Sequence, residues 1–200
     1  MVAPVAYEAG IISATQAWLE KAVIGLDLCP FAKVAYDKNQ IRYAVSAAET
    51  AEALLADLIC ELRVLAAANT DDVETTLLIH PAVLADFLDY NDFLDQADAT
   101  VVALGLEGEI QIASFHPRYQ FAGSSPDDIE NYTNRSPYPM LHLLRESSIE
   151  RGLAAFPEAA QISGKNLATL RRIGHDGWNR LKIAAATPSG VHETDFVKIL

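Results

Sequence analysis

Three short strand-like runs, separated by long stretches with helical periodicity, constrain the fold of this chain most strongly. The runs span residues 41–45, 75–79 and 109–115. The first and third alternate in polarity, whereas the continuous run TTLLI at 75–79 is typical of a central strand buried on both faces. This order of elements predicts an α/β or α+β domain, in which helices pack on a small sheet of three to five strands.

Helical periodicity marks most of the sequence outside these runs. Gly25 is the expected C-cap of the first helix and Thr50 the expected N-cap of the second. The second helix carries a leucine stripe on one side and small residues, among them Cys60, on the other. We expect both sides to be covered, the second by another helix or by a second subunit in a homodimer. The predicted helices span residues 11–24, 51–68, 82–97, 136–156 and 166–181.

Composition and charge narrow the class of protein. Of 200 residues, 50% are hydrophobic and 21% charged, which predicts a single globular domain over 1–184 with a loosely held tail over 185–200. A net charge of −12 argues against nucleic acid and membrane surfaces as partners. Only two cysteines, no export signal and no long apolar run predict a soluble, cytoplasmic protein.

A polar connection of about twenty residues follows the strand at 109–115. So long a connection in a compact domain is usually functional or disordered, and its many aromatic residues argue against disorder. We expect Arg135 to bind the carboxylate or phosphate of a small anionic molecule. The alternative is that this arginine pairs with an acidic residue of the same loop and holds it closed. The residues expected to contact the ligand are Tyr119, Asn131, Asn134 and Arg135.

Two strands end in the same way, with LLIHP at 77–81 and ASFHP at 113–117. If both strands run in the same direction, His80 and His116 lie on one edge of the sheet, where ligands of parallel sheets bind. The alternative is that each His-Pro pair merely ends a strand, with the ring bonded to a loop carbonyl. We favour this structural role for His80 and an acid–base role for His116.

Cys29 and the pair His142 and Glu146 complete the predicted catalytic set. Pro30 suits the first position of a short helix, which would place the Cys29 thiol at the N-cap, lower its pKa and make it a nucleophile. A small buried cysteine is the equally weighted alternative. His142 and Glu146 are four residues apart in a predicted helix, so the carboxylate is expected to orient the ring and raise its pKa, unless the two form an ordinary ion pair.

Two other functions stay open beside this enzyme-like site. One is a non-catalytic interaction module, in which polar side chains of 116–146 pair with one another and leave no pocket. The other is a metal-binding protein. Neither a glycine-rich phosphate loop nor another common cofactor motif is present, so the cofactor, the metal and the reaction type stay unassigned. The ligands of a metal would come from Cys29, His80, His116, His142 and Glu146.

Three motifs of the chain together resemble a bacterial family known as domain of unknown function 1415. They are GLDLCPFA at 25–32, FHPRYQFAG at 115–123 and NYTNRSPYPMLHLLRE at 131–146. The resemblance extends over about residues 10 to 180. The family has no assigned activity, so the resemblance implies no substrate or mechanism. It does imply that the three motifs belong to one site, at which the catalytic and ligand-contacting residues named above would converge.

Overall fold

The central sheet has four strands in the order β1-β2-β4-β3 in a computed structural model, which describes residues 4–155 and 162–183. β1 and β2 are parallel, and β4 is antiparallel to both of its neighbours. β1, β2 and β3 therefore point the same way. The predicted tail at 185–200 lies outside the described residues. The strands are Ile41–Val45 (β1), Thr75–Ile79 (β2), Ile110–Phe115 (β3) and Met140–Arg145 (β4).

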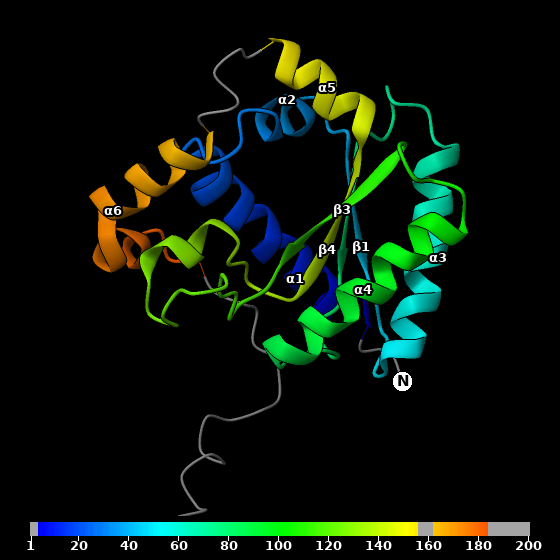
Figure 1. Ribbon diagram of the computed structural model, residues 1–200, viewed down its shortest axis with the longest axis horizontal. Helices are drawn as coiled ribbons and strands as arrows, with labels where there is room; N and C mark the ends of the chain where they lie inside the picture. Colours follow the sequence, from blue (N-terminus) through cyan, green and yellow to red (C-terminus); the bar gives the residue numbers. More distant parts are fainter. Residues whose placement is uncertain (1–3, 156–161, 184–200) are drawn as a thin grey trace, which may run out of the picture.

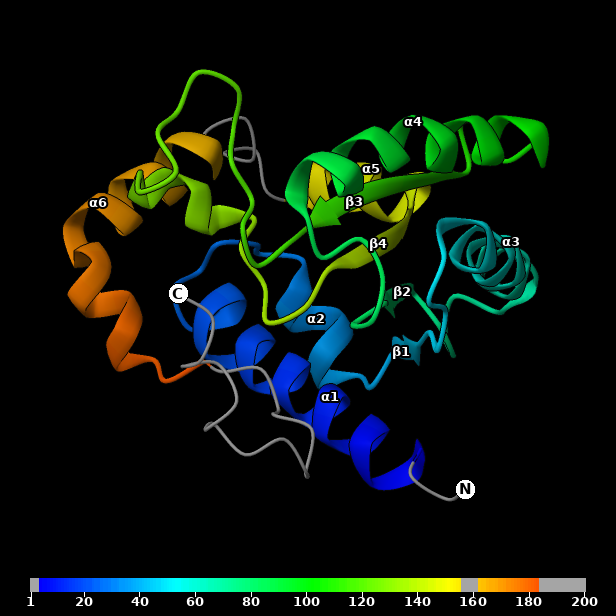
Figure 2. The same ribbon diagram turned by 90° about the horizontal axis from the view of Figure 1, so that it is seen from below.

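Helices cover both faces of this sheet, which makes the domain a single α/β unit. α3 lies on one side of the sheet and α1 on the other, and α6 packs against η2 at a distance from the sheet (Figures 1 and 2). No helix in the described ranges is long and apolar enough to span a membrane. The helices are α1 (Pro4–Trp18), α2 (Ala32–Asp37), α3 (Ala51–Ala67), α4 (Phe87–Ala103), α5 (Glu146–Ala155) and α6 (Ile162–Arg180), with a π-helical turn η1 (Leu19–Ile24) and a 3-10 turn η2 (Ile129–Thr133).

The predicted leucine stripe of α3 forms much of the core. Thr50 is its N-cap, since the Thr50 hydroxyl accepts a hydrogen bond from the Ala53 N–H at 3.2 Å. The second, small-residue side of α3 is exposed, and Cys60 with it. The expectation that Cys60 is buried is therefore wrong for the single chain, because no other helix of residues 4–155 and 162–183 covers this side. The leucines that pack against the sheet and α4 are Leu54, Leu58, Leu62 and Leu65.

Two helix ends differ from the prediction, because contacts of the local backbone determine them. Gly25 ends η1 with φ −66°, so it is not a left-handed cap; glycine is needed because a Cβ would lie 2.5 Å from the Lys21 carbonyl oxygen. The helix predicted at 82–97 begins only at Phe87. Asp86 is its N-cap and accepts a hydrogen bond from the Leu88 N–H at 2.9 Å.

The helix predicted over 136–156 is wrong in its first half, which forms β4, while only its second half forms α5. β4 lies between β2 and β3 and is apolar on both faces. A short apolar run such as MLHLLR fits a buried strand and a buried helix equally well by spacing alone. The prolines at 137 and 139 should have favoured the strand, because a residue before proline prefers extended backbone.

Arg145, at the end of β4, caps the carboxyl end of α3. Its Nη2 donates hydrogen bonds to the carbonyls of Leu65 at 2.6 Å and Ala68 at 2.7 Å. We expect Arg145→Met to lower the free energy of unfolding by about 2 kcal/mol, because it leaves these carbonyls and the negative end of the helix dipole without a cation. Urea unfolding measures the change. Arg151→Met is the control, because that guanidinium is largely exposed; equal losses in the two variants would contradict the capping role.

Candidate functional site

A cavity of about 680 Å³ lies on the α1 side of the sheet, between the strands, α2 and α5. Its floor comes from alternate residues of β4 and β3, since His142 and Leu144 face this side while Leu141 and Leu143 face the other. Ala113 lies opposite His142 in the sheet, and its small side chain leaves room above the strands. The other main lining residues are Trp18, Leu19, Val23, Cys29, Phe31, Leu77, Phe115, Ile149 and Gly152.

Charged residues line this cavity only at one end. They come from the edge of the sheet where β1 and β2 begin and β4 ends, and we call them the charged rim. One pair within it is bonded, with Arg151 donating to Glu74 at 3.0 Å. The cavity is therefore apolar inside and polar at one end, which suits a molecule with an apolar body. The charged rim consists of Lys38, Asp71, Glu74, Arg145 and Arg151.

His142 is the one histidine in the lining of this cavity. Its Nε2 lies 2.8 Å from the Thr75 hydroxyl, which in turn donates to the Leu143 carbonyl at 2.6 Å. Burial among apolar side chains lowers the pKa of His142 to about 4, because the charged ring would lose its hydration. The ring is therefore neutral at pH 7. The predicted rise in its pKa is wrong, because no carboxylate in the described part of the chain pairs with the ring.

Cys29 reaches the same cavity from the loop that precedes α2. Phe31, and not Cys29, is the N-cap of α2, so the predicted position of the thiol at the helix end is wrong. Burial raises the pKa of Cys29, although the N–H groups of Phe31 and Ala32 lower it in part. The predicted fall in pKa is thus reversed, and at neutral pH the group is a thiol that needs a base before it can act as a nucleophile.

His80 and His116 lie on the same edge of the sheet, as the parallel direction of β2 and β3 requires. Their rings flank Tyr90, with centroid distances of 5.7 Å for His80 and 5.1 Å for His116. Both side chains are buried, and burial lowers the pKa of each, to about 4 for His80. This edge is packed with aromatic rings, and neither histidine lines the cavity.

The hydrogen bonds of His116 favour the structural alternative considered for it. Its Nε2 donates to the Leu84 carbonyl at 3.2 Å, and its Nδ1 accepts from the Arg118 N–H at 3.0 Å. Both ring nitrogens are therefore occupied in a side chain that is 1% exposed. The ring fixes the start of the long loop to the turn before α4.

The long loop uses Arg135 internally. Its Nε donates to the Tyr119 carbonyl at 3.3 Å, its Nη2 donates to the Pro126 carbonyl at 2.5 Å, and its guanidinium lies 4.2 Å from the centroid of the Tyr132 ring. The arginine thus holds the loop closed, through carbonyls and a ring and not through the acidic residues considered above. Arg135 does not line the cavity.

The two asparagines also bond within this part of the chain. Asn131 is fully buried; its Oδ1 accepts from the Phe121 N–H at 3.0 Å and its Nδ2 donates to the Ser125 carbonyl at 2.8 Å. Asn134 donates to the Ser114 carbonyl at 3.1 Å. These contacts turn an irregular segment into an ordered one, because they satisfy backbone groups that have no sheet or helix partner.

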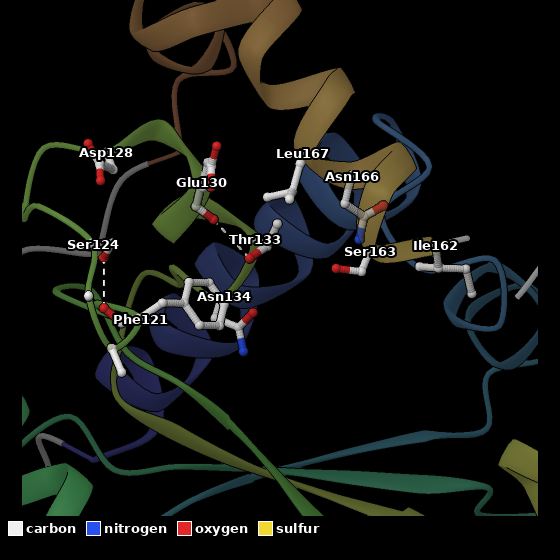
Figure 3. A pocket seen from close by; sticks show the side chains of 12 residues that line it. Phe121, Ser124, Asp128, Glu130, Thr133, Asn134, Ile162, Ser163, Asn166 and Leu167 are labelled. Carbon is white, nitrogen blue, oxygen red and sulfur yellow. Dashed lines mark hydrogen bonds between the residues drawn. The ribbon is translucent and has the colours of Figure 1, made fainter. Parts of the chain in front are cut away.

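A second hollow of about 560 Å³ separates this loop from α6. Figure 3 shows Ser163, Asn166 and Leu167 of α6 on one side and Thr133 and Asn134 of the loop on the other. Its lining holds the carboxylates of Asp128 and Glu130 but none of the predicted catalytic residues. The first cavity is for this reason the better candidate for chemistry.

The structure thus brings together Cys29 and His142 but not the other predicted site residues. Glu146 is the first residue of α5 and outside the cavity lining. No group of three or more metal-ligating side chains occurs among the described residues. Sequence reasoning missed Thr75, because the sequence does not distinguish its bonded hydroxyl from that of the neighbouring Thr76, which has no partner among the described residues.

A family model described as a protein of unknown function, DUF1415, matches residues 10–180. The chain belongs to this family. The three motifs, Cys29 and His142 all lie within the DUF1415 match, so the cavity is built from the part of the chain that defines the family. No curated protein and no solved structure matched the chain in the corresponding searches.

Proposed function

We propose that this DUF1415 protein binds a small, mainly apolar molecule in the cavity and has an enzyme-like site there. The observation that supports this function is that Cys29 and His142, more than a hundred residues apart in sequence, line one cavity. Its volume of about 680 Å³ lies within the range of small-molecule sites. A thiol and an imidazole in one apolar pocket are typical of the few polar groups that orient a molecule in a small-molecule site.

The proposed roles follow from the protonation states of the two groups. His142 is neutral at pH 7 and offers a lone pair, while Cys29 is a protonated thiol. Because burial lowers the pKa of His142 and raises that of Cys29, transfer of the thiol proton to the ring is unfavourable in the empty cavity. In this proposal His142 accepts a hydrogen bond from the bound molecule, and Cys29 contacts the molecule as a thiol.

The sequence predicts an anionic ligand, and the proposed function places the anionic group of such a ligand elsewhere than at Arg135. Arg135 is engaged in the loop, so a carboxylate or phosphate on the ligand would lie at the charged rim instead. Lys38 and Arg151 are the exposed cations there, while Asp71 and Glu74 oppose them. The apolar body of the ligand, and not an anionic group, is expected to supply most of the affinity.

The two cysteines allow a direct test, since one lines the cavity and the other is exposed on α3. In Cys60→Ser the remaining thiol is Cys29, and in Cys29→Ser it is Cys60. We expect N-ethylmaleimide to modify Cys29 more slowly than Cys60, by about tenfold or more, because burial limits access and raises its pKa. Intact-mass spectrometry follows both reactions. Added 4-methylphenol or 4-fluorotoluene should slow modification of Cys29 and leave Cys60 unaffected.

Substitution of a floor residue provides the matched control. Ala113→Leu fills space in the cavity and should abolish protection by either compound, whereas Ala66→Leu on the exposed side of α3 should not. If neither compound protects Cys29 at any soluble concentration, or if both cysteines are protected alike, the cavity is not a binding site. That result would favour the non-catalytic module, with which the internally bonded loop is consistent.

A further inference from the structure

The hydrogen bonds of His142 determine which of its nitrogens carries the proton. The Thr75 hydroxyl has a single proton, and the Leu143 carbonyl, 2.6 Å away, can only accept. The hydroxyl proton therefore goes to the carbonyl, and the Thr75 oxygen must accept from His142 Nε2 at 2.8 Å. A neutral ring protonated at Nε2 is unprotonated at Nδ1.

Nδ1 of His142 is thus a lone-pair acceptor at the floor of the cavity. Among the described residues no side chain or backbone group donates to it, and it is not one of the fully enclosed polar atoms without a partner. The ring is partly exposed and lines the cavity, so the acceptor is accessible from there. Its neighbours in the sheet on either side, Leu77 and Ala113, are apolar and offer it no donor.

We propose that the inner end of the ligand is an uncharged alcohol or phenol group, whose hydroxyl donates a hydrogen bond to Nδ1 of His142. This inference rests on the proposed function and adds the class of molecule. Thr75 is the positioning residue, because it fixes the tautomer from the far side of the ring. An unpaired acceptor in an apolar cavity selects for a donor, since a ligand that lacks one leaves it without a hydrogen bond.

The distribution of charge supports an uncharged inner group on the ligand. An anionic oxygen beside Nδ1 would face a lone pair with no cation nearby, because every charged lining residue belongs to the charged rim. A hydroxyl avoids this cost and fits beside Leu77, Ala113 and Phe115. A molecule with a hydroxyl at one end of an apolar body therefore matches both the floor and the walls.

Two compounds of similar size and shape test the inference. 4-Methylphenol carries the hydroxyl, and in 4-fluorotoluene a fluorine that cannot donate takes its place. We expect 4-methylphenol to bind about tenfold more tightly, as judged by the concentration that protects Cys29 in the Cys60→Ser variant. Equal binding of both compounds, or tighter binding of 4-fluorotoluene, would overturn the proposed ligand class while leaving the cavity a binding site. Binding of neither would instead overturn the proposed function.

Variants of Thr75 separate positioning from simple packing. In Thr75→Val the ring loses the acceptor that holds its proton on Nε2, so the preference for 4-methylphenol should fall to about onefold to threefold. Thr75→Ser keeps the hydroxyl and should keep the preference. If both variants retain the full preference, Thr75 does not set the tautomer.

Nitrogen NMR of the native protein reads the tautomer of His142 directly and without a ligand. Histidine side-chain spectra, assigned with His142→Gln, should show Nε2 of His142 protonated and Nδ1 unprotonated at neutral pH. The reverse tautomer would overturn the inference directly. Addition of 4-methylphenol should shift the Nδ1 resonance, whereas 4-fluorotoluene should shift it much less.

Discussion

Acidification from about pH 8 to about pH 5 should lower the free energy of unfolding by about 4 kcal/mol. His80 and His142 are held neutral in the folded protein, with their pKa lowered from 6.5 to about 4 by burial. The unfolded chain therefore binds more protons than the folded chain between these values. The contribution of these two rings to the free energy of unfolding is fully present above about pH 6.5 and is lost as the pH falls toward 4.

The size of this effect follows from the two rings together. Each ring accounts for a loss of about 2 kcal/mol in the free energy of unfolding between pH 8 and pH 5. His116 acts in the same direction, because burial lowers its pKa as well. Urea unfolding at a series of pH values measures the slope. His142→Gln should remove roughly half of the loss between pH 8 and pH 5, whatever it does to stability at pH 8.

A substitution that changes no titratable group supplies the control for this series. Ala66 lies on the exposed side of α3, and Ala66→Leu should leave the dependence of stability on pH unchanged. An equal slope in native protein and His142→Gln would show that the ring is not held neutral by the fold. The tautomer inferred for the cavity would then also lack support.

Tyr90→Phe should lower the free energy of unfolding by about 4 kcal/mol, a large effect for the loss of one oxygen atom. The Tyr90 hydroxyl donates to the Met140 carbonyl at 2.8 Å and accepts from the Phe115 N–H at 3.0 Å. It thereby joins the end of β3 to the start of β4 beneath the long loop. The variant leaves a buried donor and a buried acceptor unpaired, each of which costs about 1–3 kcal/mol.

Thermal and urea unfolding measure this loss, and Tyr7→Phe on the exposed surface of α1 is the matched control. Because the phenylalanine keeps the ring between His80 and His116, a large loss reports the hydroxyl and not the packing. A change below about 1 kcal/mol would mean that water replaces the missing partner at both sites.

The strands β1, β2 and β3 were predictable because each has a recognisable pattern, and a His-Pro pair ends both β2 and β3. β4 was not, because its leucines fit a helix as well as a strand by spacing alone. The choice between them depends on β2 and β3, which lie far away in sequence and supply its hydrogen bonds. Apart from the prolines at 137 and 139, the local sequence carries no signal for partners of this kind.

The candidate site was predictable only in part for a related reason. Cys29 and His142 were identified by their chemistry, and the fold places both at the cavity. Arg135, Asn131 and His116 have equally suggestive chemistry, but an irregular loop must satisfy its own backbone, and these side chains do so. Residue type alone does not distinguish a side chain that binds a ligand from one that holds a loop.

The position of β4 between two strands that point the other way has a consequence for the order of folding. β1, α3 and β2 are contiguous in the chain and can pair early, whereas β3 has no partner until β4 is in place. A growing chain that has reached residue 139 would thus expose an unpaired β3 and an incomplete core. We expect the last step of sheet formation to wait for β4, and the long loop, once closed, to hold the end of β3 where β4 begins.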